Sequence, residues 1–260
     1  MLILSVSALT IGILLVVFMI YNAFSNNLST IEVELNRFPH NSSELKVFYI
    51  SDVHNRVISE KLLNQVHDVE LVIIGGDFRD NRTPNWKIEE NLKRLSRFGP
   101  IYFIWGNNDY EGDVETFKKL LEKWKVIVVG NEVVLISYNG SFIQLAAIED
   151  MSMKKDNVHK TISSINKNEC CIFVSHDPRI RRKAGVSLQG YVDLLLSGHT
   201  HGGQIRIFGF GPYTLGGVHQ TFPYVHFVSN GYGTSIIPLR LGTKAEAHVL
   251  TIRKKPAQTI

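Results

Sequence analysis

The hydrophobic positions of this 260-residue chain form one long apolar stretch followed by a series of short ones. The long stretch runs from Leu2 to Phe24 and contains no charged side chain. At a rise of about 1.5 Å per residue it would make a helix of roughly 35 Å, which is enough to cross the hydrocarbon core of a bilayer. We therefore predict one N-terminal transmembrane helix, with residues 1–24 as a membrane anchor.

A cleaved signal peptide is the alternative for this segment, because Ala23-Phe24-Ser25 resembles a small-x-small cleavage site. However, the segment lacks a Lys/Arg-rich start and is longer than the apolar part of most signal peptides. We therefore favour an uncleaved, single-pass anchor in the cell membrane. Arg37 is the only Lys or Arg within about 15 residues after the segment. The side of the membrane on which the catalytic domain lies is therefore open, with a slight preference for the cytoplasmic side.

Residues 25–44 are polar and irregular apart from an alternation over Ile31–Leu35, and we interpret them as a tether with one possible edge strand. From residue 45 onward, short apolar runs rich in Val, Ile, Leu and Phe recur. Such runs are typical of strands that are buried on both faces of a sheet. The central ones are Val47–Ser51, Leu71–Gly75, Ile101–Trp105, Cys170–Ser175 and Val192–Ser197.

Segments with helical spacing and further strands lie between and after these runs. Ser59–Val66, Lys87–Phe98 and Val114–Lys123 predict helices. Further strands are predicted at Val126–Val129, Val133–Tyr138, Ser141–Ala147, Tyr224–Ser229 and Ala247–Arg253. We find no repeat and no domain boundary after residue 45. Residues 45–260 therefore predict one α/β domain with a mixed sheet, or with two sheets packed together.

Composition excludes several classes of protein. With 44% hydrophobic and 20% charged residues, the chain is neither disordered nor of low complexity. The net charge of +4 is spread along the chain, whereas a nucleic-acid-binding protein would concentrate its basic residues on one face. We therefore expect no nucleic-acid partner. The two cysteines, Cys170 and Cys171, are adjacent and do not form the framework of a disulfide-rich fold.

Polar residues that can bind metals follow each of the five central runs. In an open α/β sheet, ligands bind at the carboxyl ends of the strands, so these residues should converge at one edge. All the donors are oxygen or imidazole nitrogen, which suits divalent Mn, Fe, Co or Zn, and seven donors are too many for one tetrahedral ion. We therefore predict two ions. The seven candidate ligands are Asp52, His54, Asp77, Asn107, His176, His199 and His201.

Spacing and glycine content support this interpretation. Asp52 and His54, and likewise His199 and His201, are two residues apart, so in an extended segment both side chains of a pair would point to the same side. Glycines at 75, 76, 106, 198, 202 and 203 would let the backbone approach a crowded site. A lone D-x-H or G-D is more often an ordinary turn. The occurrence of every motif in order at a strand end favours a metal site.

These motifs resemble the signature of the calcineurin-like metallophosphoesterases, which is D-x-H, G-D-x-x-D, G-N-H-[DE], an isolated H and G-H-x-H. The corresponding residues are Asp52-Val53-His54, Gly76-Asp77 with Asp80, Gly106-Asn107-Asn108-Asp109, His176, and Gly198-His199-Thr200-His201. The segments GHTHGGQI at 198–205 and VSNGYGTSIIPLRL at 228–241 are similar to a membrane-associated bacterial branch of the family. The resemblance covers roughly residues 45–252.

The resemblance implies a metallophosphoesterase fold, a pair of mixed sheets flanked by helices. It implies that Asp52, His54 and His201 bind one metal and that Asn107, His176 and His199 bind the other, with Asp77 bridging them. The family usually has His at the position of Asn108. That His is thought to protonate the leaving group or to steady the phosphoryl oxygens. An amide has no usable proton to give, although its NH₂ group can donate a hydrogen bond. The candidate catalytic residues are Asn108, at the position of that His, and Asp77, which would bridge the two metals.

The expected reaction is metal-assisted hydrolysis of a phosphodiester or pyrophosphate bond. Two cations roughly 3.5–4 Å apart can share a hydroxide, lower its pKa and direct it at phosphorus. Manganese is the first candidate for the two ions, followed by Fe, Zn and Co. Several classes of substrate are compatible with this reaction. A resemblance to enzymes of lipid A synthesis makes a lipid-linked nucleotide of the UDP-diacylglucosamine type one candidate. The alternative function is a metal-binding pseudoenzyme that acts as a membrane-associated binding module.

Two segments are candidates for substrate recognition. Arg179, Arg181, Arg182 and Lys183 follow His176 closely and could hold an anionic substrate or anionic lipid headgroups. Residues 207–224 combine five aromatic residues with four glycines. This segment forms either an ordinary loop over the second sheet or an apolar wall beside the site that suits a lipid-linked or aromatic substrate. The sequence predicts neither an oligomeric state nor individual substrate-binding residues.

Overall fold

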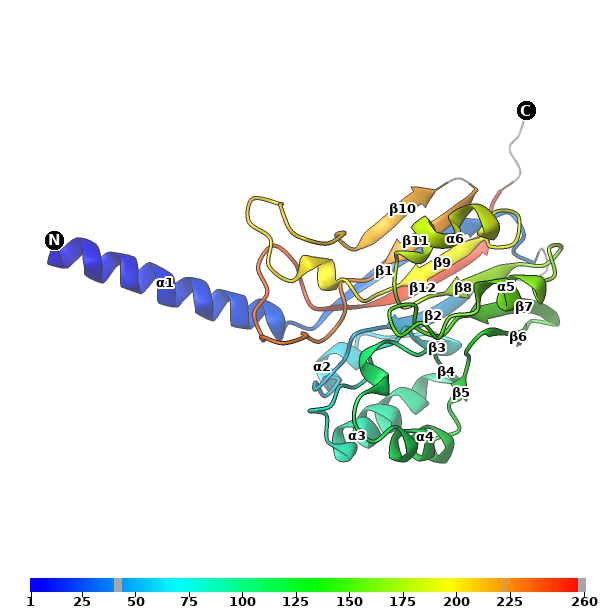
Figure 1. Cartoon of the computed structure of the whole chain (residues 1–260), viewed down its shortest axis with the longest axis horizontal. Coiled ribbons are helices and arrows are strands. Elements are labelled where there is room, and N and C mark those ends of the chain that lie inside the picture. Colours follow the sequence, from blue (N-terminus) through cyan, green and yellow to red (C-terminus); the bar gives the residue numbers. More distant parts are fainter. Residues whose placement is uncertain (40–43, 222, 257–260) are drawn as a thin grey trace.

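The computed structural model describes residues 1–39, 44–221 and 223–256 of the chain. A long helix, α1 (Leu2–Ala23), projects from one side of a domain that contains all the strands (Figure 1). Among the described residues, α1 is the one helix that is long and apolar enough to cross a membrane. Residues 40–43 of the expected tether, and residues 222 and 257–260 of the expected domain, lie outside the described residues.

Two mixed six-stranded sheets make up the centre of the domain, as the sequence predicts. The order of the first sheet is β1-β12-β2-β3-β4-β5, in which β12 is antiparallel to β2 and the other neighbours are parallel. Its strands are β1 (Asn27–Leu35), β2 (Leu45–Ile50), β3 (Leu71–Ile74), β4 (Ile101–Phe103), β5 (Ile127–Val128) and β12 (Glu246–Lys254).

The second sheet has the order β10-β11-β9-β8-β7-β6, with a parallel centre and antiparallel pairs at both edges. Its strands are β6 (Glu132–Tyr138), β7 (Ser141–Ala147), β8 (Cys171–Val174), β9 (Leu194–Ser197), β10 (Gly217–Thr221) and β11 (Tyr224–Val228). The two edge hairpins leave the parallel strands β8 and β9 in the interior, where all their residues are buried.

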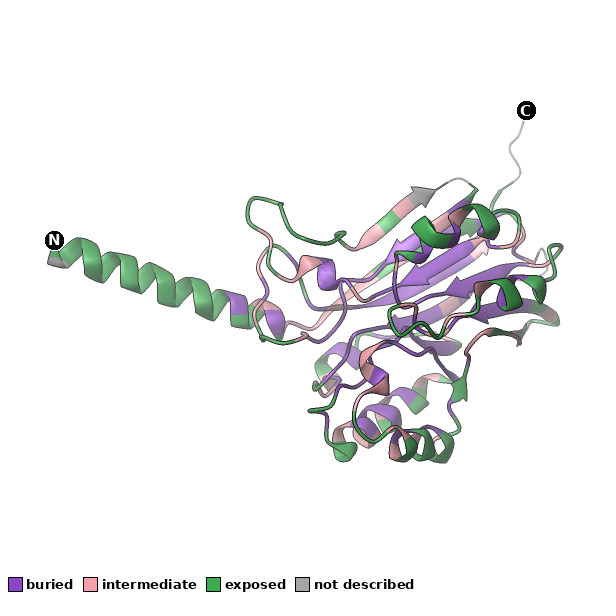
Figure 2. Cartoon of the chain, in the orientation of Figure 1, coloured by how far each residue is buried: buried purple, intermediate pink, exposed green. Residues whose placement is uncertain are grey.

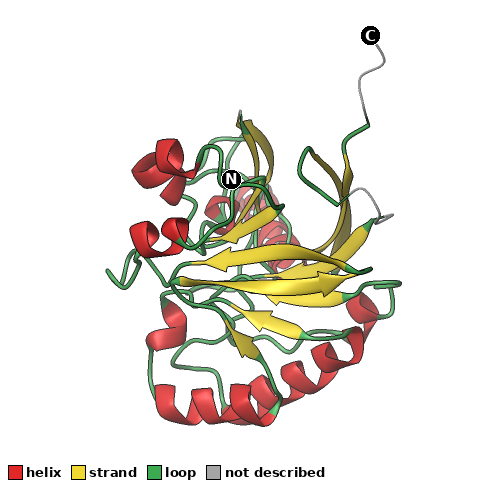
Figure 3. Cartoon of the chain, turned by 90° about the vertical axis from the view of Figure 1, so that its right-hand side faces the viewer, coloured by secondary structure: helices red, strands yellow, loops and turns green. Residues whose placement is uncertain are grey.

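The sheets pack face to face, with helices on the two outer faces (Figure 3). One apolar core lies between the sheets and includes Ile73 from the first and Leu196 from the second. Two further cores lie under the helices, and Figure 2 shows the interior strands as buried. The helices are α2 (Glu60–Leu63), α3 (Asn85–Leu95) and α4 (Val114–Lys123) on the first sheet, and α5 (Val158–Ser163) and α6 (Ile180–Leu188) on the second.

The structure confirms the possible edge strand within the expected tether and extends it from Ile31–Leu35 to residues 27–35. This segment is β1, an edge strand that pairs in parallel with β12 along its full length. Val33 and Leu35 point into the core between the sheets, which explains why the segment is ordered although its first half is polar. Only residues 24–26 separate α1 from β1. The first strand of the domain therefore begins well before residue 45.

The end of α1 is held against the domain by hydrogen bonds to its backbone. The backbone NH of Arg240 donates to the carbonyl oxygen of Met19 at 3.0 Å. The guanidinium of Arg56 donates to the carbonyl oxygens of Ala23 and Phe24 and stacks on the ring of Tyr232 at 3.7 Å. Met19 and Ala23 are buried, whereas most of α1 is exposed. The helix thus leaves the domain from a defined contact.

Candidate metal centre

The parallel strands deliver the candidate ligands to one edge of the paired sheets, as the sequence predicts. In the first sheet, β2, β3 and β4 end at Ile50, Ile74 and Phe103, and the next loops carry Asp52, Asp77 and Asn107. In the second sheet, β8 and β9 end at Val174 and Ser197, and His176 and His199 follow them. Because the two sheets are stacked, the five loops meet at their common end.

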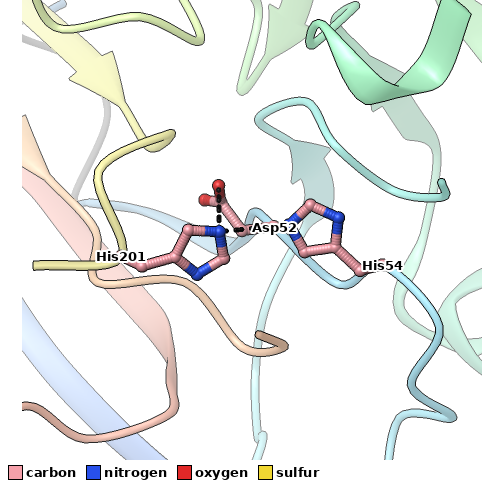
Figure 4. Close-up of side chains that lie close together, drawn as sticks. All are labelled: Asp52, His54 and His201. Atoms are coloured by element: carbon pink, nitrogen blue, oxygen red, sulfur yellow. Dashed lines mark hydrogen bonds and ion pairs between the residues drawn. The ribbon is translucent and has the colours of Figure 1, made fainter. Parts of the chain in front are cut away.

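One candidate metal site consists of Asp52, His54 and His201, all of which are buried (Figure 4). The Nε2 atoms of the two histidines lie 3.1 Å apart, and Oδ1 of Asp52 lies 3.5 Å from Nε2 of His201. Three donor atoms therefore point at the same small volume. Such convergence of two imidazoles and one carboxylate is typical of a site for a divalent transition metal.

The second candidate site consists of Asp77, His176 and His199. Nδ1 of His176 lies 2.8 Å from the carbonyl oxygen of Gly75, which can only accept, so Nδ1 carries the proton of the neutral ring. The lone pair of Nε2 therefore faces Oδ2 of Asp77 at 3.3 Å, and among the described residues this nitrogen has no hydrogen-bond partner. Two facing lone pairs repel each other unless a cation or a proton lies between them, so the residues present fit a metal ion.

Asp77 lies between the two sites. Its Oδ2 is 3.3 Å from Nε2 of His176 and 3.9 Å from Nε2 of His54, which belong to different sites. Its Oδ1 accepts a hydrogen bond of 2.8 Å from the backbone NH of Asn108. This amide fixes the carboxylate, so that the other oxygen stays directed between the two groups of histidines.

The side chains of Asn107 and Asn108 are oriented by one hydrogen bond between them and by a second one to Glu111. Nδ2 of Asn107 donates to Oδ1 of Asn108 at 3.0 Å, and Nδ2 of Asn108 donates to Oε1 of Glu111 at 2.9 Å. Oδ1 of Asn107 is buried and has no hydrogen-bond partner within the described part of the chain. An unpartnered buried oxygen beside two candidate metal sites is what a metal-binding amide requires.

Burial and charge together set the pKa values in the site. Burial lowers the pKa of His201 to about 3 and also lowers the pKa of His199, which keeps both rings neutral. Burial acts in the same direction on His176, but the charge of Asp77 outweighs it and raises the pKa of His176 above its usual value. Burial would raise the pKa of Asp77, yet His176 and the amide of Asn108 lower it overall, so Asp77 is ionised.

The backbone at five candidate ligands is left-handed, and this corrects the expected geometry of the paired residues. The φ angles are 54° at Asp52, 50° at His54, 50° at Asp77, 69° at His199 and 49° at His201. Asp52 and His54, like His199 and His201, are therefore not in extended segments. Asp52 and His54 nevertheless share one site, whereas His199 and His201 belong to different sites. Non-glycine residues rarely adopt positive φ, at a cost of about 1–3 kcal/mol each, so such strain tends to concentrate at functional sites.

Two glycines allow the loops to approach the carboxylates. A Cβ atom on Gly106 would lie 2.3 Å from both the backbone nitrogen and Oδ1 of Asp77. A Cβ atom on Gly198 would lie 2.5 Å from Oδ2 of Asp52. Any larger residue would displace the carboxylate in question, so glycine is required for packing at these positions.

Arg240 and Asp109, to which the sequence interpretation gave no role, hold the loops of the site by hydrogen bonds. The guanidinium of Arg240 is fully buried, lies 3.2 Å from Nδ1 of His201 and donates to the carbonyl oxygens of Asn230 and Gly233. The carboxylate of Asp109 accepts hydrogen bonds from the backbone NH groups of Gly106 and Asp77. Asp109 is the last residue of the Gly106–Asp109 motif, whereas nothing in the sequence indicates that Arg240 is buried.

A cavity of about 670 Å³ adjoins the second candidate site. Its wall includes His199, three arginines from the region of α6, and Tyr213 from the loop after the GHTHGGQ motif. Arg179 is neutralised by Asp177 and Lys183 by Asp156. In the described part of the chain, no carboxylate pairs with Arg181 or Arg182. The basic run therefore contributes net positive charge to this cavity from these two residues.

Comparison with known proteins identifies the family. Residues 45–203 match the sequence profile of the calcineurin-like phosphoesterases, which is more than half of the chain. The chain is 43% identical over 211 residues to the uncharacterized protein YpbG of Bacillus subtilis, covering 80% of this chain and 81% of YpbG. It is 29% identical over 259 residues to a bovine "transmembrane protein with metallophosphoesterase domain", covering 88% of this chain and 57% of the bovine protein.

Solved structures agree in fold. A 5'-nucleotidase precursor from Thermus thermophilus superimposes with a TM-score of 0.52 at 12% sequence identity, covering 80% of this chain and 55% of that protein. At this level of identity the likeness concerns the fold alone. The matched profile, which covers more than half of the chain, shows that the chain belongs to the calcineurin-like metallophosphoesterase family, whose members are hydrolases that act on phosphoester bonds.

Proposed function

We propose that the protein is a membrane-anchored, two-metal phosphohydrolase that cleaves a phosphodiester or pyrophosphate bond in a lipid-linked substrate. The observation that carries the proposal is the cavity beside His199, which combines unpaired positive charge with an aromatic and apolar wall. The family supplies the reaction class, and the cavity distinguishes among its substrates. The enzyme would thus belong to lipid metabolism.

In this proposal, Asp52, His54 and His201 hold one divalent ion, while His176, His199 and the oxygen of Asn107 hold the other. Asp77 bridges them, because its Oδ2 faces histidines of both sites. Two such ions, most simply manganese, would activate a water molecule as the nucleophile and neutralise charge on the phosphoryl oxygens. Carboxylate, amide and imidazole donors suit manganese, and they also suit Fe, Zn and Co.

Arg181 and Arg182 are suited to bind a second negatively charged group of the substrate. Their guanidinium groups line the cavity together with His199, and guanidinium recognises phosphate through paired hydrogen bonds. Tyr213 and Pro212 also line the cavity and offer a surface against which an aromatic base or an acyl chain can pack. A pyrophosphate-linked lipid, such as a diacylglucosamine nucleotide, carries both kinds of group.

Membrane anchoring is supported by α1 and by its contact with the domain. A signal peptide is removed, whereas the end of α1 is bonded to Arg240 and Arg56 and is buried at Ala23. The bovine relative is itself described as a transmembrane protein. We therefore propose that α1 stays attached as a single-pass anchor.

Asn108 has no proton to give to the leaving group, and its amide already donates to Glu111. The leaving oxygen in our proposal therefore departs without a proton from this position. Phosphates and phenolates depart easily as anions, whereas simple alkoxides do not. This chemistry favours pyrophosphate linkages and activated diesters over alkyl diesters.

The proposal can be tested by metal analysis and hydrolysis assays on the full-length protein in detergent. The wild type should hold about two divalent ions per chain and hydrolyse aryl phosphodiesters when manganese is added. Asp77→Asn should reduce both metal content and turnover, whereas the matched control Asp68→Asn, at an exposed position, should change neither. At most one ion in the manganese-loaded wild type, or full turnover by Asp77→Asn, would contradict the two-metal site.

The substrate class needs a second comparison. Arg182→Ala should raise KM more for a pyrophosphate-linked substrate than for a diester with a single phosphate, because only the former has a second charged group for the cavity. Arg97→Ala, at an exposed position in the short 3₁₀ helix Ser96–Phe98 that follows α3, is the control. Equal effects of Arg182→Ala on the two substrates would contradict the assignment of the cavity.

A further inference from the structure

Two loops beside α1 expose large apolar side chains to solvent. Phe208 is 96% exposed, Phe210 is 82% exposed and Ile236 is 83% exposed, and Ile207 and Ile237 are also exposed. We call these five residues the apolar loop surface. Single exposed apolar residues are ordinary, but a contiguous group on one face marks a site of interaction with another protein or a membrane.

The two loops form one preformed surface because hydrogen bonds join them. Arg206 and Leu241 are linked backbone to backbone at 2.7 Å, and the side chain of Gln204 donates to the carbonyl oxygen of Ile237 at 2.8 Å. Within the first loop, the guanidinium of Arg206 donates to the carbonyl oxygens of Gly209 and Tyr213. The exposed side chains of Phe208 and Phe210 are thus carried by a loop whose backbone is held by internal hydrogen bonds.

The apolar loop surface lies where α1 leaves the domain. Ile236 and Pro238 line the same depression as Ala23 and Phe24, and Arg240 in the second loop binds the carbonyl oxygen of Met19. In Figure 1 the loop after η3 (His201–Gly203) and the loop between β11 and β12 extend toward α1, and Figure 2 shows them mostly exposed. A helix that spans a bilayer would bring both loops to the surface of that bilayer.

Charge near this surface fits anionic headgroups. Arg56 and Lys87 line the same depression, and neither is paired with a carboxylate among the described residues, whereas Arg82, which lines it as well, is neutralised by Asp80. Basic residues beside apolar side chains are the usual composition of segments that lie in the interface of a membrane. This position beside α1 favours a lipid bilayer over a protein partner as the occupant.

We infer that the apolar loop surface inserts into the interface of the bilayer that α1 spans, so that the active-site cavity opens at the membrane surface. The inference rests on the proposed anchoring by α1. It also adds to the proposed function, because the loop that carries Phe208 and Phe210 supplies Pro212 and Tyr213 to the cavity beside His199. A phosphoester at headgroup depth could then reach the metal centre while its acyl chains remain in the membrane.

Site-specific labelling of the full-length protein tests this inference. The native cysteines are buried, so a new exposed cysteine can be labelled with an environment-sensitive nitrobenzoxadiazole group. Phe208→Cys and Ile236→Cys probe the apolar loop surface, and Val17→Cys probes α1. Phe142→Cys is the matched control, because Phe142 is also exposed but lies at the start of β7, at the end of the sheet opposite the site. The labelled proteins are reconstituted into phosphatidylcholine vesicles containing about a quarter phosphatidylglycerol.

The labels at positions 17, 208 and 236 should shift to the blue and be quenched by nitroxide-bearing lipids, while the label at 142 should behave as in water. Solvent-like labels at 208 and 236 beside a quenched label at 17 would overturn the inference and leave the anchor intact. A solvent-like label at 17 would overturn both the anchor and the inference. Labels at 208 and 236 that are shielded in native membranes but not in the vesicles would indicate a protein partner and would also overturn it.

A hydrolysis assay gives an independent readout. Phe208→Ser combined with Phe210→Ser should lower the rate on CDP-diacylglycerol in vesicles by about tenfold, if the loop positions the cavity at the lipid surface. The same variant should hydrolyse a water-soluble aryl diester at the wild-type rate, because neither side chain lines the cavity. An unchanged rate on the vesicle substrate would overturn the inference.

Discussion

Gly106→Ala tests whether close packing around Asp77 is required for activity. The new Cβ atom would lie 2.3 Å from the backbone nitrogen and from Oδ1 of Asp77. Carbon atoms in contact are normally separated by about 3.5–4 Å, so Asp77 or the loop of Gly106 must move by about 1 Å. A displacement of about 1 Å at a catalytic group can cost about 10²-fold in rate. We therefore expect kcat to fall about a hundredfold and the bound metal to decrease.

The assay is hydrolysis of an aryl phosphodiester at saturating manganese, together with metal analysis of the same sample. Gly185→Ala is the matched control, since it lies in α6 and its Cβ would meet no atom closer than 3.3 Å. That variant should keep wild-type activity, because its Cβ atom would contact the Tyr224 hydroxyl and the side chain of Arg181 rather than a candidate metal ligand. If Gly106→Ala retains activity within about threefold of the wild type, the packing argument is wrong.

Three further predictions concern the leaving group, the attachment of α1 and acid stability. Asn108→His should accelerate hydrolysis of alkyl diesters more than that of aryl diesters, by about the 10²–10⁴-fold that a positioned acid contributes. If the rate of the wild type depends only weakly on the pKa of the leaving group, and the variant does not change this dependence, the prediction is wrong. Arg56→Met removes the hydrogen-bond donors to the carbonyl oxygens of the residues that follow α1, so limited proteolysis in detergent should cut the chain faster at residues 24–26. Arg97→Met is the control, and equal cleavage rates of the two variants would contradict this role of Arg56. Burial lowers the pKa of His248 to about 3, so the unfolded chain binds more protons below about pH 6.5 and the free energy of unfolding should fall as the pH falls. Between pH 6.5 and 5 the loss of unfolding free energy attributable to His248 is about 2 kcal/mol. The unfolding free energy of His248→Gln, measured by urea unfolding, should therefore fall less over this range. An equal fall in both proteins would contradict the role of His248.

The fold and the candidate ligands could be predicted because they depend on short-range patterns. Buried strands such as Leu71–Ile74 appear as continuous apolar runs, and their carboxyl ends meet at one edge whatever the detailed topology. The order of polar residues after these strands was therefore enough to predict that Asp77 and His176 approach each other. Assignment of individual metal ligands and of catalytic roles remains a prediction.

Other features depended on tertiary contacts that no local pattern reveals. The first half of β1 is polar, and it is a strand because β12 supplies a complete row of hydrogen-bond partners. Helix α5 is too short to show a helical period. Helix α6, in contrast, has buried residues at Ile180, Ala184 and Leu188, so the spacing was present in the sequence and was overlooked among the basic residues. The left-handed backbone at His199 arises from packing around the site and has no counterpart in residue type.

The short connection between α1 and β1 has a consequence for how the enzyme would meet its substrate. Only residues 24–26 separate the helix from a strand that is paired with β12 throughout. A flexible linker of many residues would let the domain tumble, whereas this short connection strongly limits rotation of the domain relative to the helix. With α1 in a bilayer, the domain keeps one height and one orientation, and its search for substrate takes place in two dimensions. Such an enzyme samples molecules that reach it by lateral diffusion, and its turnover depends on their surface density in the membrane.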